Sequence, residues 1–582
     1  MAEFDLVVLG GGLGGVAAVL AAAQLGRRSV LVSETDWIGG QVSSQCIPPD
    51  EHPWIESVGC TRSYREFRDR VRGFYRRNYP LNAAARASRR LNPGSGNIGP
   101  LAHEPHVAAL VLEEMLAPWI SNGLVTVLRQ REIVAAEVTG DTITAVRVRR
   151  VDDAGDAGDA DDADGTHGGD GGETELTGRY FLDATDLGDL IEAAGAEHVF
   201  GAESQDATGE PHAQPGPADP ADQQAITWAA VLGWQPDRDN TIERPAGYEQ
   251  WRSFTPPEWP GPLLSWEVSD HITHRPRLRP LFTSEVGDGG VRYDLWHARR
   301  VLDRRHLENG WSDVTVAAWP MMDYTRLPLL GVDAAARQRA LAGARSLTRS
   351  FIYWMQTEAP RHDGGTGYPE LAPRPEISGR PDGLARMAYV RESRRIVADF
   401  TLLEQHIGVE ARAGRDGAER FPDSVGICAY RIDVHPSTSG RPTIDIDTWP
   451  FQLPLGTLLP VRLRNLLPAS KNIGATHLTS GASRVHPGEW TVGEAAGALA
   501  AFSVAERLHP RQVRGDERRL ADFKRVLTGR LGFELEWPRY EALTPTHRFG
   551  YVAAPALADA STTGATTAGA ITIGATANGA AR

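Results

Sequence analysis

Two histidines and an arginine gather late in the chain, at His477, Arg484 and His486. An imidazole can take up or release a proton near neutral pH, and a guanidinium can bind a carboxylate or stabilise a developing negative charge. The segment that follows, "GEWTVGEAAGALAAFSVAERL", predicts a strong helix. The three residues are therefore candidate catalytic groups beside a helix end, and the ligand that they face must be sought elsewhere in the chain.

The N-terminal residues predict what that ligand is. "FDLVVLG" (4–10) is a short apolar run typical of a buried parallel strand, and an Ala-rich helix and a second strand (29–34) follow it. Glu34 ends the second strand, where a carboxylate can accept hydrogen bonds from both ribose hydroxyls of a dinucleotide. Between the first strand and the helix, "GGGLGG" forms a GxGxxG turn that lets the backbone approach a pyrophosphate, with glycines at Gly10, Gly12, Gly14 and Gly15.

The position of this unit favours FAD over NAD. A resident FAD is expected at an N-terminal unit of this kind, whereas NAD usually enters at a second one, and the sequence contains no second GxGxxG. Gly40 and Gln41, in "SETDWIGGQ", follow soon after the acidic residue, and such a turn lets backbone amides approach the flavin side of the cofactor. We therefore expect FAD as the cofactor.

The bulk properties describe an ordinary globular chain and exclude several classes. The formal charge of −14 argues against nucleic acid as a partner, because phosphate binding needs a basic face. Three scattered cysteines are too few for a disulfide framework, and no metal site is expected. No run of about 18 apolar residues predicts a membrane span. The first predicted strand leaves no room for a signal peptide, so a cytoplasmic protein is expected.

The chain is predicted to be an α/β protein with a Rossmann-like FAD-binding domain, built from a parallel sheet and a β-meander, and an inserted α+β substrate domain. The insert is rich in tryptophan and proline, with amphipathic helices expected near 334–357 and 384–406. The expected division is a discontinuous FAD-binding domain (1–200 and 455–510), a substrate domain (201–454), an acidic flexible loop (152–175), a C-terminal helical segment (511–550) and a low-complexity tail (551–582).

Seven motifs, in order along the chain, carry a resemblance to known proteins. The sequence resembles FAD-dependent oxidoreductases with a glutathione-reductase-like FAD-binding domain, and more narrowly a bacterial subgroup of them. The resemblance covers about residues 4–505. Its motifs are "TDWIGGQ", "IPPDEHPWIE", "LNPGSGNIG", "HEPHVA", "YFLDATDLGDL", "AYVRESRRI" and "GATHLTSGASRVHPGEWTVGEAAG".

This resemblance implies a role for each matching position. The glycines of the GxGxxG turn would hold the pyrophosphate and Glu34 the adenosine ribose, while Val134 would contact adenine through its backbone. Gly40 and Gln41 would lie near the flavin or its ribityl chain. The segment Ala184, Thr185 and Asp186 would pass the pyrophosphate, although Asp186 stands where many flavoproteins have glycine, which argues against direct phosphate contact there. Gly493 and Glu494 would open the last helix toward the isoalloxazine ring, because a helix N-terminus stabilises the anion of reduced flavin.

Two reactions compete at such a site. The first is an oxidase or dehydrogenase that removes a hydride from a C–H bond next to a hydroxyl or amine of a small molecule, with His477 or His486 as general base and oxygen or another electron acceptor as partner. The alternative is a flavin monooxygenase that uses an external reductant. Elsewhere, "YVRESRR" predicts a helix with an internal ion-pair network of Arg391, Glu392 and Arg395, and Asp323, Tyr324 and Arg326 are candidates to line the substrate face.

Overall fold

A computed structural model of the chain describes residues 3–151, 172–285 and 292–537. Most of the predicted acidic loop and the whole of the predicted tail lie outside these ranges. The described residues all belong to one compact unit, so the domain boundaries expected near residues 200 and 454 stay predictions.

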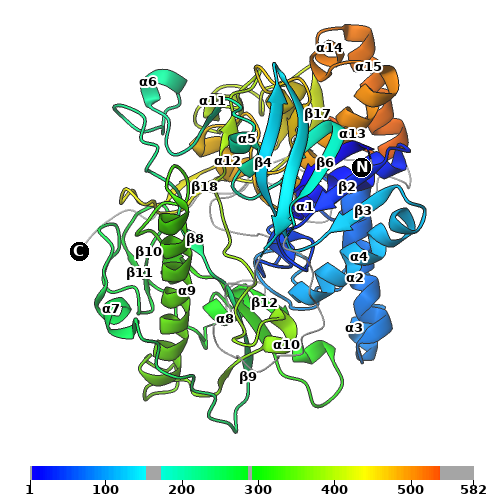
Figure 1. Ribbon diagram of the computed structural model, residues 1–582. Coiled ribbons are helices and arrows are strands. Elements are labelled where there is room, and N and C mark those ends of the chain that lie inside the picture. The colour runs from blue at the N-terminus through cyan, green and yellow to red at the C-terminus, as the bar shows by residue number, and fades with distance from the viewer. Residues whose placement is uncertain (1–2, 152–171, 286–291, 538–582) are drawn as a thin grey trace, which may run out of the picture. The chain divides into compact units, whose positions relative to one another are not determined.

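A seven-stranded mixed sheet forms the N-terminal part of the fold, and its order is β3-β2-β1-β6-β5-β4, with β21 paired to the end of β6 (Figure 1). The parallel strands are β3 (Val125–Leu128), β2 (Ser29–Val32), β1 (Glu3–Leu9), β6 (Thr174–Asp183) and β21 (Leu466–Pro468). The hairpin of β4 (Arg131–Thr139) and β5 (Thr142–Arg150) adds antiparallel strands to β6. The predicted Rossmann-like sheet with a meander is confirmed.

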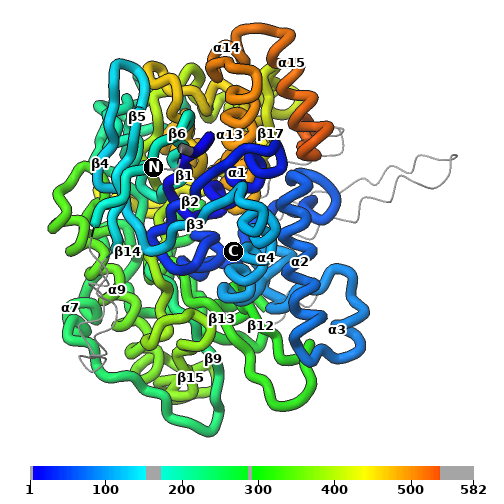
Figure 2. Tube along the Cα trace, turned by 45° about the vertical axis from the view of Figure 1, so that its right-hand side comes forward, coloured from blue at the N-terminus to red at the C-terminus, as the bar shows by residue number. Residues whose placement is uncertain are grey.

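Two helices far apart in the sequence cover this sheet together. Helix α1 (Leu13–Gln24) follows β1, and helix α13 (His486–Glu506) returns beside it from the C-terminal part of the chain, as Figures 1 and 2 show. The two backbones approach so closely that a Cβ atom at Gly493 would lie 2.0 Å from the Gly14 carbonyl oxygen, and glycine at this position permits the contact. The core behind them is built from the buried aliphatic side chains of β1, α1 and α13.

The Trp-rich middle of the chain has a core of its own. Its sheet has the order β12-β13-β9-β15, formed by β12 (Arg300–Leu302), β13 (Val314–Ala317), β9 (Ala230–Trp234) and β15 (Leu371–Pro373). Helix α9 (Ala334–Thr357) lies at the predicted residues and buries Phe351 and Trp354 in this core. A short pair, β8 (Ile226–Thr227) and β14 (Asp323–Tyr324), runs antiparallel nearby.

The predicted helix near 384–406 is wrong. This segment is extended, with β16 (Arg395–Ile396) paired to β7 (His198–Val199) and only a short helix, α11 (Glu404–Ile407), near its end. Arg391 and Arg395 are buried, and each reaches a different distant partner: Arg391 bonds to the Ala225 carbonyl and Arg395 to the Gly201 carbonyl. An extended backbone satisfies these partners, whereas a helix would have turned the side chains toward one another.

The remaining described elements complete the chain around these two cores. Helices α2 (Arg62–Asn78) and α4 (Pro105–Ser121) lie near β3, and α12 (His477–Ser483) precedes α13. A pair of strands, β18 (Ile432–Val434) and β19 (Ile444–Ile446), lies against α12. After α13 the chain continues through α14 (Pro510–Arg514), α15 (Glu517–Arg525) and the π-helical turn η6 (Val526–Leu531).

Candidate functional site

The glycine turn between β1 and α1 has the geometry that a dinucleotide requires. Gly10 has a φ of +104°, and a Cβ atom there would lie 2.1 Å from the backbone of Ala184. A Cβ atom at Gly15 would lie 2.0 Å from the Gly10 carbonyl oxygen, so this residue must also be glycine for the helix to begin where it does. The turn is therefore shaped by close backbone contacts, which is the role expected for these glycines.

The "IGGQ" turn joins the glycine turn directly. The Gly39 amide donates to the Gly11 carbonyl at 2.7 Å, and a Cβ atom at Gly40 would lie 2.9 Å from the Gly12 Cα. Gln41 is fully buried, and its Nε2 donates to the Arg484 carbonyl at 3.0 Å. The structure thus brings Gly40 and Gln41 to the glycine turn and ties them to the segment that opens α13.

Glu489 also belongs to this site, although it is absent from the residues that the sequence singled out. It lies in the first turn of α13, where its carboxylate accepts from the Gly14 amide at 3.3 Å and from Ser470 Oγ at 3.0 Å, and also from Gln41 Nε2. Burial raises the pKa of this carboxyl group. Its place in the first turn of the predicted helix "GEWTVGEAAG" was the available signal, and the sequence analysis did not use it.

Glu34 lies just beyond β2 with its carboxylate near other acidic groups. Burial, and then the neighbouring Asp189 and Asp186, raise the pKa of Glu34 to about 8. In the described part of the chain no hydrogen-bond donor reaches this carboxylate. A carboxylate with a raised pKa and no hydrogen-bond donor among the described residues suits ribose hydroxyls, which would donate hydrogen bonds to it and stabilise its charge.

The turn after β6 passes the glycine turn as expected. The Asp183 carboxylate organises it by accepting from the Thr185 amide at 2.9 Å and from the Ile191 amide at 2.8 Å. The Asp186 carboxylate accepts hydrogen bonds from Gln45 Nε2, at 2.6 Å, and from Lys471 Nζ. Asp186 thus serves as a partner for Lys471, and the expectation that it makes no direct phosphate contact stays a prediction.

Val134 sits at an irregularity of the edge strand β4. Ile133 pairs with Val148 and Ala135 with Arg147, so Val134 is an extra residue between two consecutive pairs. The extra residue of a bulge is left out of the hydrogen-bond ladder. Its backbone groups are therefore available to a ligand, which suits the adenine contact predicted for it.

The prediction that Gly493 and Glu494 open the last helix is wrong. Helix α13 begins at His486, and both residues lie two turns inside it. Gly493 packs on Gly14 of α1, and Glu494 accepts from Ser63 Oγ at 2.6 Å and from Trp490 Nε1 at 3.1 Å. Sequence reasoning placed the helix start too late because His486-Pro487 reads as a loop, although proline is favoured in the first turn of a helix.

The three candidate catalytic residues do not face one another. His486 is fully buried, with its Nε2 at 3.2 Å from the Ile47 carbonyl and its Nδ1 accepting from the Asp50 amide at 3.1 Å. Burial lowers the pKa of His486 to about 4, so it is neutral at physiological pH. Both ring nitrogens are occupied by backbone groups, and His486 is therefore a structural support for the loop at 47–50 and unsuited to act as general base.

His477 lies between two charged side chains. Its Nε2 accepts from Arg441 Nη2 at 2.7 Å, and its Nδ1 lies 3.1 Å from Glu392 Oε2. Glu392 in turn pairs with Arg395 at 2.8 Å, whereas Arg391 lies 3.2 Å from Asp323. One pair of the predicted network therefore exists, although the predicted helix does not. His477 thus completes a buried network of charges.

Arg484 lies between the cofactor side and the middle of the chain. Its Nη1 donates to the Tyr389 hydroxyl at 2.6 Å, and its Nη2 donates to the Asp433 carbonyl at 2.9 Å. All three residues are buried. Together with Gln41 and Glu489, Arg484 forms a hydrogen-bonded chain from the glycine turn to β18.

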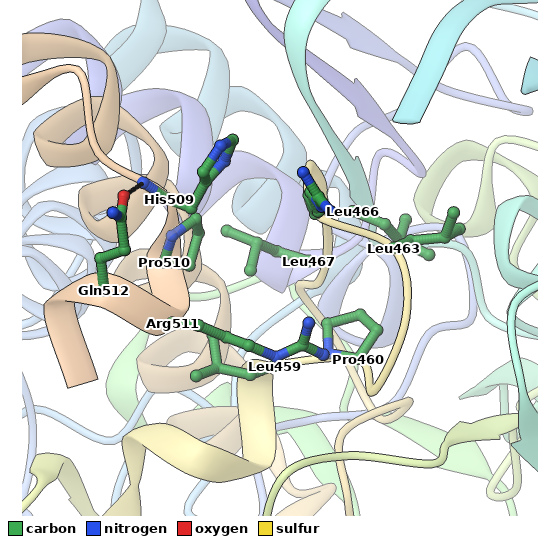
Figure 3. Close-up of a pocket in the computed structure, with 10 residues that line it drawn as sticks. Leu459, Pro460, Leu463, Leu466, Leu467, His509, Pro510, Arg511 and Gln512 are labelled. Atoms are coloured by element: carbon green, nitrogen blue, oxygen red, sulfur yellow. Dashed lines mark hydrogen bonds between the residues drawn. The ribbon is translucent and has the colours of Figure 1, made fainter. Parts of the chain in front are cut away.

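A cavity of about 230 Å³ lies elsewhere, toward the start of β21 (Figure 3). The residues that line it include Leu459, Leu463 and Leu467 from the chain around β21, and Arg511 from α14. The glycine turn instead approaches the end of β21, because a Cβ atom at Gly14 would lie 1.8 Å from the Ala469 carbonyl oxygen. This cavity is therefore not the dinucleotide site.

The fold and the glycine turn define a dinucleotide-binding α/β protein, and the residues present fit FAD. Besides the glycines, Glu34 and the bulged Val134, the side-chain oxygens of Gln41 and Gln45 are buried, and within the ranges described they have no hydrogen-bond partner. A model of the family "FAD dependent oxidoreductase" matches residues 5–527. The chain belongs to this family, and it is an FAD-dependent enzyme.

Similar solved structures cover different shares of the chain. OxyS anhydrotetracycline hydroxylase from Streptomyces rimosus is 13% identical over 91% of this chain and 68% of its own, with a TM-score of 0.29. A geranylgeranyl bacteriochlorophyll reductase-like protein from Thermoplasma acidophilum is 8% identical over 91% and 85%, with a TM-score of 0.30. The myxobacterial chondrochloren halogenase is 16% identical over 41% of this chain and 46% of its own, with a TM-score of 0.23.

These low TM-scores mean that none of the three structures bears on the reaction. No curated protein shows a significant sequence match. Within the described ranges, no helix has the length and apolar character needed to cross a membrane, and no group of three potential metal ligands was found there.

Proposed function

We propose that the protein is an FAD-dependent oxidase or dehydrogenase that removes a hydride from a C–H bond next to a hydroxyl or amine of a small molecule. Bound FAD supplies the acceptor for that hydride. The observation that carries this proposal is the buried polar chain from Glu489 and Gln41 through Arg484 to Asp433 and Tyr389. It provides fixed charges and a hydroxyl group between the glycine turn and the Trp-rich middle of the chain.

Each part of this chain has a task that follows from its position. The glycine turn and Glu34 would hold the pyrophosphate and the adenosine ribose, and Val134 would hold adenine through its backbone. Arg484 is a buried cation, and its charge favours any anion that develops beside it. Tyr389 and Asp433 keep the guanidinium in one orientation, so this charge is already in place before the reaction begins.

The order of motifs supports placement in the glutathione-reductase-like, bacterial subgroup. Oxygen or another acceptor would then take the electrons from the cofactor, and the substrate would lie against the middle of the chain. A flavin monooxygenase is the competing function, and it differs in needing an external reductant such as NAD(P)H before any substrate is attacked.

Anaerobic mixing of the purified holoenzyme separates these functions. The probes are primary and secondary alcohols, 2-hydroxy acids, amino acids and amines, each added without NAD(P)H while the flavin absorbance is followed. Bleaching by one of these classes supports the proposal. If the flavin bleaches with NAD(P)H but with none of these probes, the proposed function is wrong and the monooxygenase is favoured. Dithionite serves as the control that the flavin can be reduced.

A further inference from the structure

His435 differs from His477 and His486 in what its ring nitrogens touch. It directly follows β18, and its Nδ1 lies 2.5 Å from Asp323 Oδ2. Its Nε2 lies 3.6 Å from Asp433 Oδ2, which is beyond hydrogen-bonding distance. The side chain is 16% exposed, whereas Asp323 is buried. One nitrogen is therefore anchored, and among the described residues the other meets only this more distant carboxylate.

Asp323 is itself held firmly. Its Oδ1 accepts from Thr227 Oγ1 at 2.5 Å and lies 3.2 Å from Arg391 Nη2. Burial alone would raise the pKa of Asp323, but Arg391 and His435 outweigh it and lower the pKa to about 2. Asp323 is thus an ionised acceptor at physiological pH, and its hydrogen bond with His435 keeps a proton on the Nδ1 atom of that ring.

His435 is linked to the cofactor side of the molecule through Asp433. Asp433, its neighbour, accepts from Arg484 through its carbonyl oxygen, and the Asp433 Oδ2 lies 3.3 Å from Arg484 Nη2. The Arg484 carbonyl is bound by Gln41, which meets Glu489 beside the glycine turn. The Oδ1 atom of Asp433 is buried and, in the described part of the chain, has no hydrogen-bond partner.

We propose that His435 is the proton acceptor of the reaction and that Asp323 is the positioning residue that orients it; this rests on the proposed function. The O–H or N–H proton of the substrate goes to His435 Nε2. The neighbouring C–H bond breaks with its electron pair, which leaves as the hydride for oxidised FAD, and a C=O or C=N bond forms. The substrate loses two electrons and FAD gains them, so atoms and charge balance.

Several charged groups surround His435 and set the conditions for this step. Asp323 from β14 and Asp433 from β18 flank the imidazole, and Arg391 and Arg484 lie behind these two carboxylates. Arg431 lies 3.9 Å from Asp433, and His271 interacts electrostatically with both His435 and Asp433. The proton that the step delivers to His435 is therefore received between two carboxylates.

A spectroscopic test needs no substrate. Holoenzyme labelled with imidazole ¹⁵N reports which ring nitrogen carries the proton, and His435→Asn identifies the His435 signals. In the wild type we expect neutral His435 to be protonated on Nδ1, and in Asp323→Asn we expect that preference to be lost. A wild-type ring protonated on Nε2, or an unchanged tautomer in Asp323→Asn, would overturn the proposal.

A kinetic test uses whichever alcohol or amine bleaches the wild-type flavin. His435→Asn should slow flavin reduction by about 10²–10⁴-fold while FAD content is unchanged, and the slower reaction should lose the wild-type fall in rate at low pH. His306→Asn is the matched control, because His306 binds Ser95 Oγ at 2.8 Å in η3 (Arg304–His306), outside this network. Wild-type rates in His435→Asn would overturn the role of His435 and leave the proposed function standing. If every probe failed with the wild type, the proposed function would be contradicted, and the tautomer measurement would still decide the role of His435.

Discussion

If Glu34 binds the adenosine ribose as we propose, the affinity for FAD should depend on pH in a direction that follows from the raised pKa of Glu34. Without cofactor, the pKa of Glu34 is raised from 4.5 to about 8, chiefly by burial and by Asp189. Ribose hydroxyls donate hydrogen bonds and so favour the ionised carboxylate. Binding of FAD must then release a proton below pH 8, and the affinity should weaken as the pH falls through this value.

The magnitude follows from the two pKa values. If the ribose returns Glu34 to its ordinary pKa of 4.5, the dissociation constant should be up to about 90-fold larger at pH 6 than at pH 9, which is about 2.7 kcal/mol. The assay is titration of the apoprotein with FAD, followed by the quenching of flavin fluorescence between pH 6 and pH 9. Glu34→Gln cannot ionise and should show a nearly flat profile.

The control for this experiment is Glu137→Gln, which changes an exposed carboxylate on β4. It should keep the wild-type slope. A wild-type affinity that does not change with pH, or a Glu34→Gln profile as steep as that of the wild type, would refute the ribose role of Glu34. A uniform loss of affinity in both variants would instead point to a general effect of charge on FAD binding.

Three further predictions test other parts of the site. Gly493→Ala places a Cβ atom 2.0 Å from the Gly14 carbonyl oxygen, so it should lower the free energy of unfolding by about 1–3 kcal/mol or more and release flavin. Gly529→Ala is the control, because a Cβ atom there would have no atom within 4 Å. Equal thermal unfolding of the two variants would contradict the packing argument. Arg484→Ala should retain FAD but slow its reduction by substrate about 100-fold, and stopped-flow traces equal to the wild type would remove Arg484 from the site. Burial lowers the pKa of His486 from 6.5 to about 4, so this histidine is protonated in the unfolded chain first, and folding stability is lost as the pH falls below 6.5. In denaturant titrations, the stability advantage of the wild type over His486→Asn should therefore shrink by about 1.4 kcal/mol per pH unit down to pH 4. A constant difference would exclude a buried neutral His486.

Local patterns in the sequence were sufficient to predict the first strand–helix–strand unit. The strand, the glycine turn and the helix at 4–26 are encoded within a few residues of one another, because glycine permits the turn and the apolar run forms the buried strand. The position of Glu34 at the end of the next strand follows from the same unit. Helix α9 was equally predictable, since its periodicity and its Asp333 N-cap are local features.

Elements whose partners are distant in sequence could not be predicted in this way. The segment at 384–406 has helix-forming residues, but its buried arginines bond to carbonyl groups that lie more than a hundred positions away, and those contacts hold it extended. The start of α13 was misplaced for a related reason. His486 opens this helix while it binds the backbone of Ile47 and Asp50, and no local pattern reports such contacts.

The catalytic assignment shows the same division most clearly. From the sequence alone, His477, Arg484 and His486 were equivalent candidates, and the type of each residue justified them. Only the tertiary structure shows that both ring nitrogens of His486 bond to backbone groups and that His477 lies between Arg441 and Glu392. It also shows that His435 has one nitrogen anchored by Asp323, from a strand more than a hundred positions earlier. Residue type sets what a side chain can do, and the partners that folding brings to it decide which of those roles remains open.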